Sequence, residues 1–463
     1  MATGSAILAG GLLSLLVDGL PYADARILAL VPTGMLIIFV LAKVVRHGWS
    51  DFLDPAVMVS AGFLIFYSAG VIIEPANYAS FYSDPSVSTP IISLYTGSVL
   101  LFLLGYSIGS KARLRGLQGH QVGVMIDVSR FWTCFLALTA ALIGIMLVVS
   151  IRGNYPLIAF FLQSGYGPRV FSIQNESSLV GYLLRLLGIL PIAVCILAAT
   201  LLSLPGLSRV QLVGGLGVLA FCVAFLWSTG ARFWLIYGAG GGLLLWYELT
   251  QRTDPAKLYR NKSSVLLACI LIAWATSQQM VVRPLGGLAG YMQTGQTRLA
   301  GLQDVVEPGI DQLPMLEVIT SIVPHERRYL LGATYLSPLF TLLPRAWWPA
   351  KPSDLAVYVE GYTGLWNANT AFGVLGELYA NFGTPGVLVG MWLFGILAGR
   401  WRTLYFERRA SLVVGAIYMM SLLVFAFVVR GSFHTAVAGM LYPALIVVPT
   451  LRLSLRLLHS SNR

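Results

Sequence analysis

The chain has 463 residues, of which 57% are hydrophobic and only 11% are charged, and its mean hydropathy is +0.77. Soluble domains carry about 25% charged residues, so this composition leaves too little polar surface to cover a water-exposed globule. The net charge of +11 is spread over short segments between apolar runs and forms no basic domain. This excludes a nucleic-acid partner and favours a membrane protein.

Apolar runs of about 18 residues or more recur along the chain, and runs of this length are typical of membrane-spanning helices. They predict an all-α polytopic integral membrane protein with about 12 transmembrane helices. We expect the spans near residues 5–17, 27–45, 55–73, 90–109, 131–151, 179–203, 211–228, 232–249, 264–282, 384–399, 411–429 and 434–451.

The positions of Lys and Arg predict the orientation, because cytoplasmic loops carry an excess of these residues. With the N-terminus inside, most Lys and Arg fall in inner loops and in the C-terminal tail, so both termini are expected to be cytoplasmic. One outer loop, 283–369, is too long for a simple connector, and its aromatic stretch 329–348 is expected to form short helices at the membrane interface. The predicted domains are 1–282 (membrane domain, nine spans), 283–369 (large periplasmic loop) and 370–463 (membrane domain, three spans).

Three arginines lie inside or at the edge of predicted spans, where a charge at a helix centre costs roughly 2.5–3.5 kcal/mol. They are Arg185, Arg232 and Arg430, and the predicted topology puts all three near the outer surface. One explanation is snorkelling to the interface. Because all three lie near one depth, we favour a common anionic ligand, and the planar guanidinium suits a phosphate. Arg185 lies deepest and is expected to serve packing.

The segment 376–383 (GELYANFG) places Glu377 and Asn381 four residues apart, so on a helix they share a face. Thr384 and Pro385 then read as an N-cap and the first residue of a new helix. Residues 370–382 are therefore expected to form a separate short helix, with Glu377 at its outer, partly buried end. A carboxylate there is suited to act as a general base; the alternative is an ion pair with one of the arginines.

The segment 344–352 (PRAWWPAKP) has three prolines, which stiffen the chain. We expect Arg345 and Lys351 to be held outward beside Trp347 and its neighbouring tryptophan. Aromatic faces with nearby cations suit sugar rings and phosphates, although an interfacial anchor has the same composition. His434, four residues from Arg430, is either a catalytic group or a histidine packed at a helix end.

The outer segments have no DxD motif, and the chain has no Walker A, HExxH or GxSxG motif. We therefore expect no metal site and no metal-bound sugar nucleotide.

Four short segments together resemble the O-antigen polymerase (Wzy-type) family. They are STGAR at 228–232, PRAWWPAKP at 344–352, GELYANFG at 376–383 and VVRG at 428–431. The hydropathy profile, with its large outer loop before the last spans, is similar to that of the family over most of the chain. The double tryptophan is a departure from the family's proline-rich motif, and His434 is not one of its motif positions.

The resemblance implies a polyprenyl-diphosphate-dependent glycosyltransferase that polymerises undecaprenyl-diphosphate-linked repeat units at the periplasmic face of the bacterial inner membrane, without a cofactor. The implied partners are lipid-linked oligosaccharides, membrane lipid, a chain-length regulator and a flippase. The catalytic candidates are Glu377, Arg430 and His434. The substrate-binding candidates are Arg232, Arg345, Lys351, Asn381, Trp347 and Tyr379.

Two other functions remain open. A flippase of the same lipid-linked sugars would need charged residues deep in a cavity that opens to both sides, and transporters often show inverted repeats; the sequence shows neither. A ligase that joins glycan to the lipid A core uses the same donor chemistry, and only the segments at 344–352 and 376–383 favour the polymerase.

Overall fold

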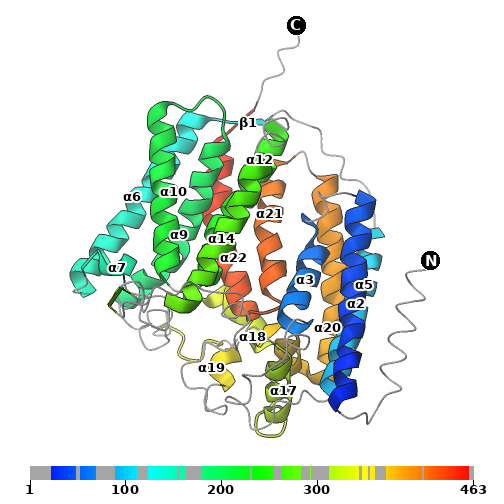
Figure 1. The fold of residues 1–463 in the computed structure, drawn as a ribbon. Coiled ribbons are helices and arrows are strands. Elements are labelled where there is room, and N and C mark those ends of the chain that lie inside the picture. Colours follow the sequence, from blue (N-terminus) through cyan, green and yellow to red (C-terminus); the bar gives the residue numbers. More distant parts are fainter. Residues whose placement is uncertain are drawn as a thin grey trace.

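The structure is a computed structural model, and it describes residues 22–47, 53–68, 89–111, 124–153, 156–162, 179–229, 232–253, 262–282, 292–293, 312–343, 347–352, 355–359, 372–408 and 411–457. In this part of the chain, long helices lie side by side in a bundle, and shorter helices gather at one end of it (Figure 1).

The long helices follow the apolar runs of the sequence. They are α2 (Tyr22–His47), α5 (Thr89–Lys111), α6 (Val128–Gly153), α9 (Leu179–Ser203), α10 (Arg209–Ser228), α12 (Gly241–Thr253), α14 (Lys262–Val282), α20 (Gly373–Glu407), α21 (Leu412–Phe427) and α22 (Phe433–Leu453). Two interrupted helices complete the bundle: α3 (Pro55–Phe63) continues into the π-helix η2 (Leu64–Ser68), and α11 (Arg232–Leu235) continues through η5 (Ile236–Gly240) into α12.

The structure confirms a helical protein with several helices suited to a membrane. Within the described residues, six helices are long and apolar enough to span a bilayer: Pro90–Lys111, Val128–Arg152, Tyr182–Ser203, Arg209–Ser228, Gly373–Glu407 and Phe433–Leu453. The predicted span at 5–17 lies outside the described residues, and each of the other predicted spans overlaps a helix. The number of 12 membrane spans therefore stays a prediction.

The two ends of the bundle differ in structure. At one end, β1 (Val124–Ile126) pairs in antiparallel fashion with β2 (Leu455–Leu457), with Met125 opposite Arg456. At the other end lie α17 (Leu313–Ile322), α18 (Ala333–Leu336), the 3₁₀ segment η6 (Ser337–Phe340) and α19 (Leu355–Val359) (Figure 1). We call these the sheet end and the short-helix end. The short helices lie within the segment 283–369, in which short helices were predicted.

Glycines allow α5 and α20 to pack with their backbones in contact. A Cβ atom on Gly105 would lie 2.1 Å from the carbonyl oxygen of Trp392, and one on Gly395 would lie 2.1 Å from that of Phe102. Small residues at such crossings are typical of helix pairs in membranes, where close backbone approach supplies the packing energy. This contact anchors α20, the helix that carries Glu377.

Helix α20 bends sharply at Gly383, whose φ of 67° and ψ of −163° are not helical. A positive φ suits glycine, which has no Cβ atom to clash, and Pro385 starts the second segment with a preset φ. The predicted separation of a short helix before Thr384 is confirmed. The first segment, 373–382, is largely buried and points into the short-helix end.

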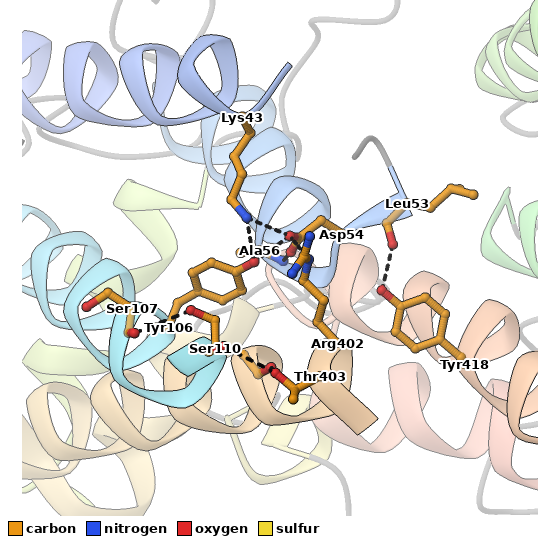
Figure 2. A network of polar contacts seen from close by, with 11 residues as sticks. Lys43, Leu53, Asp54, Ala56, Tyr106, Ser107, Ser110, Arg402, Thr403 and Tyr418 are labelled. Atoms are coloured by element: carbon orange, nitrogen blue, oxygen red, sulfur yellow. Dashed lines mark hydrogen bonds and ion pairs between the residues drawn. The ribbon is translucent and has the colours of Figure 1, made fainter. Parts of the chain in front are cut away.

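A buried carboxylate holds four helices together at the sheet end. Asp54 is 2% exposed, and atom Oδ2 accepts hydrogen bonds from Lys43 Nζ (3.0 Å) and the hydroxyl of Tyr106. Arg402 Nε lies 2.8 Å from the same oxygen. Atom Oδ1 caps α3 by accepting from the N–H of Ala56 at 2.8 Å. Figure 2 shows these side chains converging from α2, α5 and α20. A buried charge persists only when it is paired in this way.

A second buried carboxylate lies at the same end. Glu248 of α12 is fully buried, and it accepts hydrogen bonds from Arg252 Nε and from the hydroxyl of Tyr405, each at 2.7 Å. The ring of Tyr405 stacks on Tyr418 at 4.0 Å, and the Tyr418 hydroxyl donates to the carbonyl of Leu53 at 2.7 Å (Figure 2). These two buried carboxylates therefore join helices at the sheet end.

Candidate active site

Glu377 lies on the first segment of α20 and is buried, with 1% of its surface exposed. Its atom Oε2 accepts a hydrogen bond from the backbone N–H of Phe433 at 2.5 Å. Phe433 is the first residue of α22, so the carboxylate lies at a helix N-terminus, where N–H groups without helical partners and the helix dipole favour a negative charge. The predicted general base is therefore joined to the helix that carries His434.

Asn381 attaches a turn of the short-helix end to α20. Its Oδ1 accepts from the N–H of Gly332 at 2.8 Å, and its Nδ2 lies 2.8 Å from both Thr334 Oγ1 and the Glu377 carbonyl oxygen. The last contact confirms that Asn381 and Glu377 share a helix face. The amide of Asn381 is engaged within the protein, so in this structure it positions α18 beside Glu377.

His434 rests against η6 through two hydroxyl groups. Its Nδ1 lies 2.8 Å from Ser337 Oγ, and its Nε2 lies 3.4 Å from Thr341 Oγ1. Ser337 Oγ also lies 2.8 Å from the carbonyl oxygen of Thr334, which can only accept. The hydroxyl of Thr341 likewise lies near backbone carbonyl oxygens, those of Ser337 and Pro338. The two hydroxyl groups therefore hold the imidazole ring in a fixed position against η6.

Arg185 reaches the same segment from α9. Its Nη1 donates to the carbonyl oxygen of Thr341 at 2.7 Å. We expected Arg185 to serve packing, and the segment that it holds in place includes the residue that neighbours His434. A charge in an apolar helix was visible in the sequence and indicated that Arg185 has a special role. Its partner Thr341 is 156 residues away, and nothing in the sequence indicated that the two residues meet.

Arg430 lies in the turn between α21 and α22, three residues before Phe433. Its guanidinium stacks over the ring of Phe66 in η2, 5.5 Å from the ring centre. A guanidinium over an aromatic ring keeps its charge, which suits a contact with an anion. The structure therefore brings Arg430, His434 and Glu377 to the start of one helix.

The prediction for Lys351 is wrong in one respect. Instead of being held outward, its side chain is buried (6% exposed), and Nζ donates to the carbonyl oxygen of Leu343 at 3.0 Å. The physical reason is a tight turn after Trp348, whose carbonyl accepts from the N–H of Lys351 at 3.1 Å and folds the chain back. Trp347, by contrast, is 80% exposed, as an outward-facing aromatic residue should be.

The side chains of two predicted anion-binding residues lie outside the part of the chain that the structure describes. Arg345 lies outside the described residues, and Arg232 is the first residue of α11, with its side chain outside them. Tyr379 lies beside Tyr329. In the described part of the chain, no three His, Cys, Asp or Glu residues come together in a way that would hold a metal ion.

Tyr335 is a residue of this region that sequence reasoning did not single out. It lies on α18, with its ring edge-on to Phe433 at 4.9 Å and parallel to Phe382 at 6.4 Å. Burial, and then the nearby carboxylate of Glu377, raise the pKa of Tyr335, so its hydroxyl stays protonated. Within the aromatic stretch 329–348, nothing in the sequence distinguishes it.

These features define a multi-pass helical membrane protein with a candidate active site at the short-helix end of the bundle. Residues 369–460 match the family model of the O-antigen polysaccharide polymerase Wzy, which confirms the resemblance to the Wzy-type family. The match covers about a fifth of the chain, and Glu377, Asn381, Arg430 and His434 lie within it. It supports a general role as an O-antigen polymerase in polysaccharide biosynthesis. No curated protein and no solved structure matches the chain.

Proposed function

We propose that the protein polymerises oligosaccharide repeat units carried on undecaprenyl diphosphate, and that it works at the periplasmic face of the bacterial inner membrane. The observation that supports this most directly is the hydrogen bond between Glu377 and the N–H of Phe433. It joins the GELYANFG segment to the first residue of α22, shortly after the VVRG segment, so an acid, an arginine and a histidine of the family-matched region lie at one helix start.

In the proposed reaction, a hydroxyl oxygen of the new lipid-linked repeat attacks the anomeric carbon of the growing glycan. A carbon–oxygen bond forms to the acceptor sugar as the bond from the anomeric carbon to the diphosphate oxygen breaks. The hydroxyl proton passes to Glu377 as general base, and undecaprenyl diphosphate leaves with the electron pair. No cofactor is needed, because the lipid diphosphate is already a good leaving group.

The arginines would stabilise the negative charge that develops on the diphosphate. Arg430, Arg232 and Arg345 would donate paired hydrogen bonds to its oxygens, the contact for which a guanidinium is best suited. Trp347 and Tyr379 would contact sugar rings. Asn381 and Lys351, whose polar atoms contact the protein itself, would hold the surrounding turns in place.

The substrates would be lipid-linked oligosaccharides within the membrane lipid, and a flippase and a chain-length regulator would act beside the polymerase. Both termini would be cytoplasmic, with the short-helix end in the periplasm.

The test is the profile of lipid-linked glycans in a strain that lacks the protein. We expect glycans that bear a single repeat unit, restored to long chains when the protein is supplied from a plasmid. Long chains that remain on the carrier lipid would instead indicate a ligase, and repeat units retained on the cytoplasmic side would indicate a flippase. Either result would overturn the proposal.

A further inference from the structure

The hydroxyl of Tyr335 is buried, and in the described part of the chain no group forms a hydrogen bond with it. Buried polar groups in native proteins are nearly always hydrogen-bonded, and each exception calls for an explanation. Its near neighbour Thr334 illustrates the usual case, because Thr334 Oγ1 accepts from Asn381. Among the described residues, the Tyr335 hydroxyl therefore lacks the hydrogen-bond partner that a buried donor usually has.

The position of this hydroxyl is set by three independent contacts. The Tyr335 ring packs between Phe382 of α20 and Phe433 of α22, at 6.4 Å and 4.9 Å. Asn381 holds the turn on which Tyr335 lies, through Gly332 and Thr334. A side chain fixed by two rings and a hydrogen-bonded turn has little freedom to turn its hydroxyl elsewhere. The donor is thus held in place before any ligand arrives.

The chemistry around the hydroxyl limits what it can bind. The neighbouring Glu377 carboxylate is an acceptor, and the flanking groups are aromatic rings, which suit the apolar face of a sugar. A tyrosine hydroxyl that stays protonated donates one hydrogen bond. A ligand that fits would bring an acceptor oxygen on a ring that packs against aromatic groups, and a sugar has both properties.

We infer that Tyr335 is a substrate-binding residue of the acceptor-sugar subsite, in which its hydroxyl donates a hydrogen bond to an oxygen of the sugar held beside Glu377. This inference rests on the proposed function, since it names a contact of the acceptor in that reaction. Tyr335 would recognise an oxygen adjacent to the attacking one, and Glu377 would take the proton of the attacking hydroxyl.

Tyr335→Phe tests this contact, because it removes one oxygen atom and keeps both ring contacts. The effect on stability separates a binding role from a structural one. Removing a buried hydroxyl that has no hydrogen-bond partner among the described residues should leave the Tm equal or slightly higher. Tyr418→Phe is the matched control at the sheet end, since its hydroxyl has a partner in the carbonyl of Leu53. That variant should lower the Tm and keep substrate binding.

The measurements are the Tm of the purified proteins in lipid nanodiscs and the Kd of each for its lipid-linked repeat unit. We expect Tyr335→Phe to raise the Kd roughly tenfold, as loss of one hydrogen bond would do, with no fall in Tm. An unchanged Kd would overturn the inference, and so would a fall in Tm equal to that of Tyr418→Phe. Polymerisation is measured separately. If the wild-type protein binds the repeat unit and makes no polymer, the proposed function is refuted. The Kd of Tyr335→Phe then still decides whether Tyr335 binds the sugar.

Discussion

The guanidinium of Arg185 donates a hydrogen bond to the backbone carbonyl of Thr341 at 2.7 Å. The Thr341 hydroxyl in turn lies 3.4 Å from His434 Nε2. An arginine near the N-terminal end of the apolar helix α9 thus supports the segment against which His434 rests. This arrangement accounts for a charge that would be costly in an unpaired position, and it makes Arg185 part of the support of the candidate site.

Arg185→Ala should therefore reduce polymer formation although Arg185 need not touch substrate. Loss of the hydrogen bond would destabilise the packing of η6 by about 1.5 kcal/mol. Arg185→Lys should keep most of the activity, because an ammonium group can donate to the same carbonyl. Glycan chain length and protein level in a complemented deletion strain provide the measurement. If Lys fails as completely as Ala, Arg185 binds the diphosphate directly and its role here is misassigned.

Glu377→Gln should abolish polymerisation while the protein still accumulates. The amide oxygen of Gln can still accept from the N–H of Phe433, so the start of α22 should keep its position. The loss of a general base typically costs roughly 10²–10⁴ in rate. The purified variant should bind lipid-linked repeats and fail to extend them. Normal extension by this variant would exclude Glu377 as the base and make His434 the next candidate.

Arg430→Lys should lower the polymerisation rate by roughly 10²–10³, the cost of removing one preorganised donor from a developing anion. A lysine cannot reproduce the planar fork. We expect the same intolerance at Arg232 and Arg345. Phe66→Leu is the matched control for Arg430, because it keeps the charge and removes the ring over which the guanidinium stacks; its effect should be smaller. Unchanged polymer length and amount in all three Lys variants would contradict the assignment of the diphosphate to these residues.

Asp54→Asn should destabilise the bundle without touching the candidate active site. The amide can still cap α3, but Lys43 and Arg402 lose the carboxylate that they share, and breaking a buried pair costs about 3–5 kcal/mol. Arg130→Gln is the control: Arg130 pairs with Asp127 and is 61% exposed, and exposed pairs contribute about 0–1 kcal/mol. Thermal unfolding in nanodiscs measures both. Equal Tm values for the two variants would show that the Asp54 network adds no stability.

The orientation in the membrane can be tested with single cysteines in a background in which the four native cysteines are replaced. Trp347→Cys, at the exposed short-helix end, should react with a membrane-impermeant thiol reagent in intact spheroplasts. Pro205→Cys, in the exposed turn between α9 and α10, should react only after permeabilisation. Equal labelling of both in intact cells would refute the predicted topology.

The sequence by itself predicted those features that depend on near neighbours along the chain. Apolar runs predicted the helices, because a backbone in lipid must satisfy its hydrogen bonds internally. Thr384 and Pro385 predicted the break in α20, since capping and a fixed φ act within one turn. The family resemblance of the last spans also required only short motifs, and the family model confirmed it over residues 369–460.

Only the tertiary structure decided which of the candidate residues meet. Glu377 and Phe433 are 56 residues apart, and Ser337 and His434 are 97 apart, so their pairing follows from the packing of whole helices. The same packing buried Lys351 against Leu343, joined Arg185 to Thr341 and held the hydroxyl of Tyr335 beside Glu377. Side chains such as these have no distinct pattern in the sequence, because the free energy of a buried polar contact depends on a partner that folding alone brings within reach.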